Sequence, residues 1–176
     1  IDGSRVLVFG PERAVVVGPE GTAIASAERD GITHGDVAAN DRFALVHDGG
    51  VTIHGEGGRE QLRLASFGRV TDIAMSPDGR QLAVATTLAL TVNDAVDGRT
   101  LWTSDGEVKE VAYDPRGGLW ADREGVVTAF NPANGRPVGA GPMPTSTGFL
   151  VDGCLRAPDG EFCPAGTSVG LTRGAD

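Results

Sequence analysis

Histidine is the residue type in this sequence best suited to metal binding or acid–base chemistry, and it occurs three times, at His34, His47 and His54. His47 and His54 flank one short turn, and Asp48 adds a carboxylate beside them. Imidazole nitrogens and carboxylate oxygens can bind zinc and other transition metals, but this spacing matches no metal-binding signature. We therefore expect the two strand histidines to be solvated, and we expect no metal and no cofactor.

Nucleophilic and phosphate-binding motifs are also missing from the sequence. It contains no Gly-x-Ser-x-Gly stretch, and the glycine-rich "GPEGTAIAS" lacks the Lys-Ser/Thr pair of a phosphate loop. Ser26, Ser66, Ser76 and Ser104 have no base nearby in the sequence. We therefore expect no catalytic residue.

The two cysteines, Cys154 and Cys163, share the segment "CLRAPDGEFCPAG". If Pro158 and Asp159 form a two-residue turn, position 156 pairs with 161, 155 with 162, and the cysteines oppose each other. Opposed residues on antiparallel strands can form a disulfide, whereas a longer turn would leave the sulfurs diagonal. We favour the disulfide and, with it, an extracytoplasmic location; free thiols would indicate the cytoplasm.

Five segments of thirteen residues align without gaps and reveal an internal repeat. Each reads as an extended run, a small turn and a second extended run, which predicts a β-hairpin. A third run follows the first four hairpins, and an extended stretch precedes four of them, so the unit has four strands. The segments are "VLVFGPERAVVVG" from Val6, "FALVHDGGVTIHG" from Phe43, "LAVATTLALTVND" from Leu82, "LWADREGVVTAFN" from Leu119 and "CLRAPDGEFCPAG" from Cys154, with starts 37, 39, 37 and 35 residues apart.

Four antiparallel strands repeated at this period predict an all-β fold, a β-propeller. Helical repeats would need amphipathic helices, which are missing, and a β-sandwich or irregular barrel, the alternative fold, would not repeat four strands in a fixed order. We expect Trp102 and Trp120 to pack between sheets. Apolar residues with period two should stack each blade on its neighbours: Ile73, Leu82, Val84, Leu90, Val92, Val111, Val126 and Phe130.

Two of these units resemble a known superfamily. "MSPDGRQLAVAT", and more weakly "YDPRGGLWAD", is similar to the first two strands of a WD-repeat blade. "VNDAVDGRTLWT" and "FNPANGRPVGAG" resemble the turn between the third and fourth strands that WD-repeat blades share with pyrroloquinoline-quinone-type blades. The Trp-Asp pair of WD repeats is replaced by Asn93-Asp94, Asn131-Pro132 and His54-Gly55, so its hydrogen-bond network cannot be carried over to this chain.

The chain opens with the second strand of a blade. We expect one propeller domain over residues 1–176 with about four to five blades, as part of a larger ring. In that case a blade face at Val6, Val8, Val15 and Val17 should be exposed, and the isolated segment should be poorly soluble or oligomeric. The alternative is a five-bladed ring in which the tail and the N-terminal strands share one blade. The expected blades are residues 4–29, 32–66, 69–104, 107–141 and 145–173.

Composition narrows the classes of partner. The net charge of −9 repels phosphate backbones, so we expect no nucleic-acid partner. The longest apolar stretches are far shorter than the roughly 20 residues of a membrane-spanning helix, so we expect no membrane insertion. Lys109 is the only lysine, a bias that we attribute to a GC-rich coding sequence, and we expect a bacterial source.

Two functions from different classes are compatible with a propeller. We favour a non-catalytic recognition or scaffold module, such as the sensor part of a larger protein, whose partner is another protein or the remaining blades of its own chain. The alternative is part of an enzyme or small-ligand sensor with its site in the central channel, where Asp72, Lys109 and Glu110 are the candidates. The expected contact residues lie in loops on one face, with Phe67 as the anchor: Asp48, Ser66, Phe67, Arg69, Asp105, Glu107, Asp122, Arg123 and Glu124.

Overall fold

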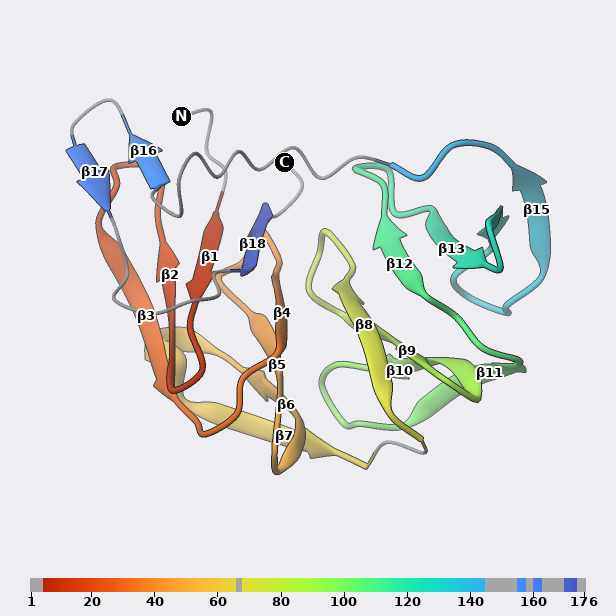
Figure 1. The fold of residues 1–176 in the computed structure, drawn as a ribbon, viewed down its shortest axis with the longest axis horizontal. Helices are drawn as coiled ribbons and strands as arrows, with labels where there is room; N and C mark the ends of the chain where they lie inside the picture. The colour runs from red at the N-terminus through yellow and green to blue at the C-terminus, as the bar shows by residue number, and fades with distance from the viewer. Residues whose placement is uncertain (1–4, 66–67, 145–154, 158–159, 163–169, 174–176) are drawn as a thin grey trace.

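The computed structural model describes residues 5–65, 68–144, 155–157, 160–162 and 170–173, which form a nearly all-β molecule. Four antiparallel sheets of four strands follow one another around a common centre (Figure 1). We call them sheets A to D. Sheet A holds β1 (Val6–Phe9), β2 (Arg13–Val17), β3 (Ala23–Glu28) and β18 (Gly170–Arg173), and sheet B holds β4 (His34–Val37), β5 (Phe43–His47), β6 (Gly50–His54) and β7 (Glu60–Leu64). Sheet C holds β8 (Val70–Met75), β9 (Gln81–Thr86), β10 (Ala89–Asp94) and β11 (Thr100–Asp105), and sheet D holds β12 (Glu110–Tyr113), β13 (Leu119–Arg123), β14 (Val126–Phe130) and β15 (Pro137–Ala140).

The repeat in the sequence has a counterpart in the backbone, a register shift that recurs in each sheet. In every sheet the pairing of the third strand with the fourth shifts register at one place: after Val16, Ile53, Val92 and Ala129. These positions are 37, 39 and 37 residues apart, which are the spacings of the hairpins. A β-bulge bends and twists a strand, so the same bend recurs at the outer edge of each sheet. The predicted β-propeller architecture of four-stranded antiparallel units is confirmed.

The last expected blade, residues 145–173, included the C-terminal strand β18, but the structure places β18 in sheet A. It pairs with β1 and completes sheet A as its first strand, with Leu171 opposite Val8. The tail and the N-terminal strands thus share one sheet, as in the alternative arrangement, because β1 otherwise presents an unpaired edge of backbone N–H and C=O groups. A separate two-stranded sheet is formed by β16 (Leu155–Ala157) and β17 (Gly160–Phe162).

The face of the first blade that was expected to be exposed carries Val6, Val8, Val15 and Val17. Val8 is buried, and Val6, Val15 and Val17 are partly buried. The opposite face of sheet A, with Leu7 and Val16 fully buried, packs on sheet B.

Apolar cores fill the three junctions between consecutive sheets. Phe43 and Leu45 belong to the core between sheets A and B, and Ile73, Leu82 and Val84 belong to the core between B and C. Leu90, Val92, Val111 and Phe130 form the core between C and D, as their period predicted. Val126 was expected there as well, but it is exposed because it follows the turn at Gly125 at the edge of the sheet.

Trp102 packs between two sheets, as expected. Its ring stacks on Phe130, with 6.1 Å between the ring centroids, and its Nε1–H donates a 2.7 Å hydrogen bond to the carbonyl oxygen of Pro132. Trp120 points to the other face of sheet D and donates to Asp114.

Candidate interaction surface

The turns between second and third strands, and the links from one sheet to the next, lie at the same edge of the sheets. Antiparallel pairing requires this, because successive turns alternate between opposite edges. Asp48, Arg69, Glu107 and Glu124 all lie in such turns or links. Ser66 and Phe67 fall outside the described residues, so the proposed aromatic anchor stays a prediction.

A wide hollow of about 670 Å³ opens at this edge, near the first strands of sheets B, C and D. Three of the nine expected contact residues, Asp48, Arg69 and Glu107, line it together. Lys109, which the sequence placed at a first-strand end, also lines it. The other polar side chains around the hollow are Thr33, His34, His47 and Thr71.

The charged side chains of the hollow are exposed. Asp48, Arg69, Glu107 and Lys109 are all exposed, and none of them forms an ion pair with another residue that the structure describes. Two carboxylates and two cations thus surround one concave surface without neutralising each other at contact distance. These charges can pair with groups of a partner at the cost of little internal rearrangement.

His47 was expected to be solvated, but its side chain is only 8% exposed. Its Nδ1 accepts a 3.0 Å hydrogen bond from the backbone N–H of Gly49. Burial, and then the nearby Arg29 and Arg63 guanidinium groups, lower the pKa of His47 and so favour the neutral ring. Because Nδ1 accepts from Gly49, the neutral ring carries its proton on Nε2. That N–H is buried and has no partner among the described residues.

His54 was also expected to be solvated, and it is fully buried. Its ring stacks on Phe43, with 4.8 Å between centroids, and its two nitrogens contact Thr52 Oγ1 and Gly58 O, each at 2.9 Å. Burial lowers the pKa of His54. Because both nitrogens are used inside the protein, His54 is a core residue rather than a ligand-binding one.

Residues 122–124 do not line the hollow. Arg123 donates to the carbonyl oxygens of Asp105 and Ser104, at 3.0 and 3.1 Å, and to the Ser104 hydroxyl at 2.9 Å. Asp122 accepts a 2.7 Å bond from the N–H of Gly125, and Glu124 has a positive φ of 54° in the same turn. These side chains therefore tie sheet D to sheet C and close a turn, which their polar character in the sequence did not reveal.

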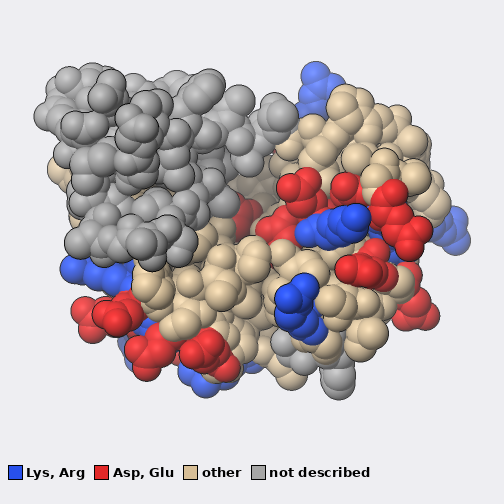
Figure 2. Space-filling model, in the orientation of Figure 1, with Lys and Arg blue, Asp and Glu red and all other residues tan. Residues whose placement is uncertain are grey.

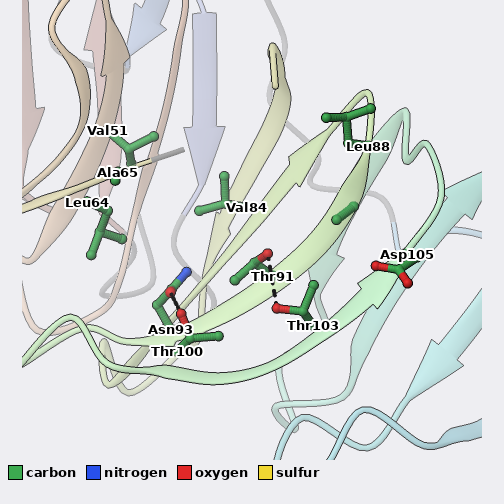
Figure 3. A pocket seen from close by; sticks show the side chains of 11 residues that line it. Val51, Leu64, Ala65, Val84, Leu88, Thr91, Asn93, Thr100, Thr103 and Asp105 are labelled. Atoms are coloured by element: carbon green, nitrogen blue, oxygen red, sulfur yellow. Dashed lines mark hydrogen bonds between the residues drawn. The ribbon is translucent and has the colours of Figure 1, made fainter. Parts of the chain in front are cut away.

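A second, smaller cavity of about 310 Å³ lies between the outer strands of sheets B and C (Figure 3). Its walls come from Val51 and Leu64 on one side and Thr91, Thr103 and Asp105 on the other. We call it the B–C cleft. Asp105 is the expected contact residue that the structure places there.

The described part of the chain contains no group of three or more His, Cys, Asp or Glu side chains arranged to hold a metal ion. It also contains no helix that is long and apolar enough to cross a membrane. On the face that Figure 2 shows, acidic side chains form one group over sheets C and D and another at the lower left over sheets A and B, with basic ones interspersed.

Comparison with known proteins supports the fold alone. No protein-family model and no curated protein matches the chain. A solved structure, described as dihydro-heme d1 dehydrogenase NirN in complex with DHE, is similar with a TM-score of 0.54 and 18% sequence identity. The similarity covers 88% of this chain but only 38% of that one. NirN contains a β-propeller, so the similarity agrees with the architecture described above.

Proposed function

We propose that this chain is a non-catalytic recognition module of the β-propeller type, and that the hollow lined by Asp48, Arg69, Glu107 and Lys109 is the centre of its contact surface. The observation that carries the proposal is the set of four exposed, unpaired charges around one concave site. Mixed charges of this kind orient a protein partner and exclude wrong ones more than they add affinity. The partner is therefore a folded protein or a neighbouring domain with complementary charges.

The repeats support descent from the WD-repeat or quinoprotein-like superfamily. In the "SPDG" turn, Asp78 Oδ1 accepts from the Ser76 hydroxyl at 2.7 Å and from the N–H of Arg80 at 3.0 Å. In the corresponding "DPRG" turn, Asp114 stands at the position of Ser76, and its Oδ1 accepts from the N–H groups of Arg116 and Gly118, at 2.8 and 2.9 Å. These side chains hold the turn between first and second strands, which is the part of the blade where the resemblance is strongest.

A small-ligand site at the same hollow is the second candidate function. It is favoured by His34 and His47 in the lining of the hollow, and by the position of the hollow at the ends of first strands. The similar structure NirN is described in complex with DHE. The two candidates use different groups: exposed charges for a protein partner, and the buried imidazole for a small ligand.

A charge-reversal experiment distinguishes the two candidate functions. The double variant Arg69→Glu/Lys109→Glu should lose a protein partner that the wild-type chain captures from an extract of its source organism. Its matched control is Arg99→Glu/Arg116→Glu, in turns at the opposite edge of the sheets, where both residues are exposed. The captured protein is then purified, and its dissociation constant should rise at least tenfold for the first variant and stay unchanged for the control.

Equal binding by both double variants would refute the recognition surface. In a thermal-shift screen, a small molecule that stabilises the wild-type chain but not a His47→Gln variant would instead support the second candidate.

A further inference from the structure

The B–C cleft lies at a junction that lacks the aromatic pair found at the next junction. Between sheets C and D, Trp102 and Phe130 stack and fill the outer part of the junction. The strand pairing shows that Leu62 and Asn93 are their equivalents between sheets B and C: Leu62 pairs with Ile53 as Trp102 does with Val92, and Asn93 pairs with Leu82 as Phe130 does with Leu119. An aromatic pair is thus replaced by one aliphatic and one amide side chain, and the amide, Asn93, lines the cavity of about 310 Å³.

The interior of the cleft suits an apolar side chain. Val51, Leu64 and Val84 line it, and the first two belong to the facing sheet B (Figure 3). The hydroxyls on the other wall are engaged within sheet C: Thr100 donates to Asn93 at 3.1 Å, and Thr91 and Thr103 lie 3.5 Å apart. An apolar cavity of about 150 Å³ holds a benzene ring, so this volume accommodates a leucine-sized side chain with room for its backbone.

The mouth of the cleft carries one charge and one exposed aliphatic side chain. Asp105 is the only charged residue among those that line it, and its carboxylate forms no ion pair with a described residue, since Arg123 binds its backbone carbonyl instead. Leu88 is 61% exposed at the rim. A single carboxylate beside an apolar cavity complements an apolar residue flanked by a basic one.

We propose that the B–C cleft binds an extended peptide segment of the partner protein, in which a leucine-like side chain enters the cavity and a neighbouring arginine or lysine pairs with Asp105. This inference rests on the proposed recognition function, because Leu88 and Asp105 lie at the same edge of the sheets as the charged hollow. The overall charge of −9 favours a basic segment further. The hollow and the cleft would then be contacted by one partner.

Short peptides test the proposal directly by NMR on the ¹⁵N-labelled whole chain. N-acetyl-Arg-Leu-Arg-amide should shift the amide signals of Val51, Leu64 and Thr91, whereas the Arg-Gly-Arg and Glu-Leu-Glu peptides should not. Filling the cleft with Thr91→Leu should weaken binding of the first peptide at least tenfold. The matched control is Thr128→Leu, the same strand position in sheet D, 37 residues later, and it should bind like the wild-type chain.

Several results would overturn the proposal: equal shifts with the Glu-Leu-Glu peptide, shifts confined to residues outside the cleft, or unaltered binding by the Thr91→Leu variant. Shifts of the cleft amides on raising the protein concentration alone would show a second copy of the chain as the occupant and would also overturn it. If the Arg69→Glu/Lys109→Glu variant loses its partner while no peptide binds the cleft, this inference fails and the proposed function stands.

Discussion

The carboxylate of Asp72 accepts a 2.9 Å hydrogen bond from the backbone N–H of Val111 and so joins the first strand of sheet C to the first strand of sheet D. Asp36 makes the same kind of link one sheet earlier, to the N–H of Met75 at 2.6 Å. Each carboxylate also accepts the N–H of the residue that follows it, at 2.9 Å. First strands have a free edge toward the centre of the ring, and these aspartates supply the acceptors that this edge lacks.

Asp72 should make stability depend on pH between about 4 and 6. Burial raises its pKa from 3.8 to about 6, because the two backbone hydrogen bonds offset only part of the desolvation. The folded state therefore binds this proton more tightly than the unfolded state does. Its contribution is fully present below pH 4 and is lost as the pH rises through 6, by on the order of 3 kcal/mol.

An Asp72→Asn variant isolates this effect, since the amide does not titrate. The difference in unfolding free energy, wild type minus variant, should fall as the pH is raised from 4 to 8, and urea unfolding at both values measures it. A difference that stays constant or grows with pH would contradict the raised pKa of Asp72.

Gly57 and Gly58 offer a sharp comparison at the junction of sheets A and B, in the short 3₁₀ turn η1 (Glu56–Gly58). Both have positive φ, 67° and 85°. A Cβ on Gly57 would meet nothing within 4 Å, whereas one on Gly58 would lie 1.8 Å from the carbonyl oxygen of Ser26. Gly57→Ala should cost about 1–2 kcal/mol through its backbone conformation alone.

Gly58→Ala should cost at least twice as much, because β3 and the turn must separate to relieve a backbone clash. Its carbonyl also accepts from His54, so the chemical shifts of that ring should change as well. Urea unfolding of the two variants checks this ranking. Equal losses of unfolding free energy would show that β3 and the turn separate at little cost.

Sequence reasoning reached the architecture because the architecture is periodic. Hairpins at fixed spacing predicted four-stranded units, and alternation predicted the cores around Leu82 and Val92. It missed the burial of His47 and His54, since the faces of a strand cannot be assigned when both lie between sheets. It also missed Asp72 and Asp36 as links between sheets, and the B–C cleft, because these depend on which residues of neighbouring repeats meet in space.

Arg123 and Glu124 were expected to act together at the contact surface, and the structure predicts different outcomes for them. Arg123→Ala removes three hydrogen bonds to sheet C and a guanidinium that lies over the Phe130 ring, 5.8 Å from its centroid. It should lower the unfolding free energy by about 1–3 kcal/mol. Glu124→Gly should be neutral or stabilising, because glycine accepts positive φ without steric strain.

A binding loss in the Asp122/Arg123/Glu124 triple alanine variant is therefore interpretable only beside these single variants. Thermal melts distinguish a structural role from a binding role. If Arg123→Ala melts at the same temperature as the wild-type chain, the three residues can contact a partner, as the sequence suggested.

The disulfide between Cys154 and Cys163 stays a prediction, because both residues lie outside the described part of the chain. The neighbouring strands have the register that it requires: Leu155 pairs with Phe162, Arg156 with Glu161 and Ala157 with Gly160. This is the pairing of a two-residue turn, and a longer turn would have shifted it by two residues and left the cysteines diagonal. Intact mass measurement after alkylation without reduction should find no added alkyl group, and two groups after reduction. Two groups before reduction would reject the bridge, and with it the extracytoplasmic location that the bridge implies.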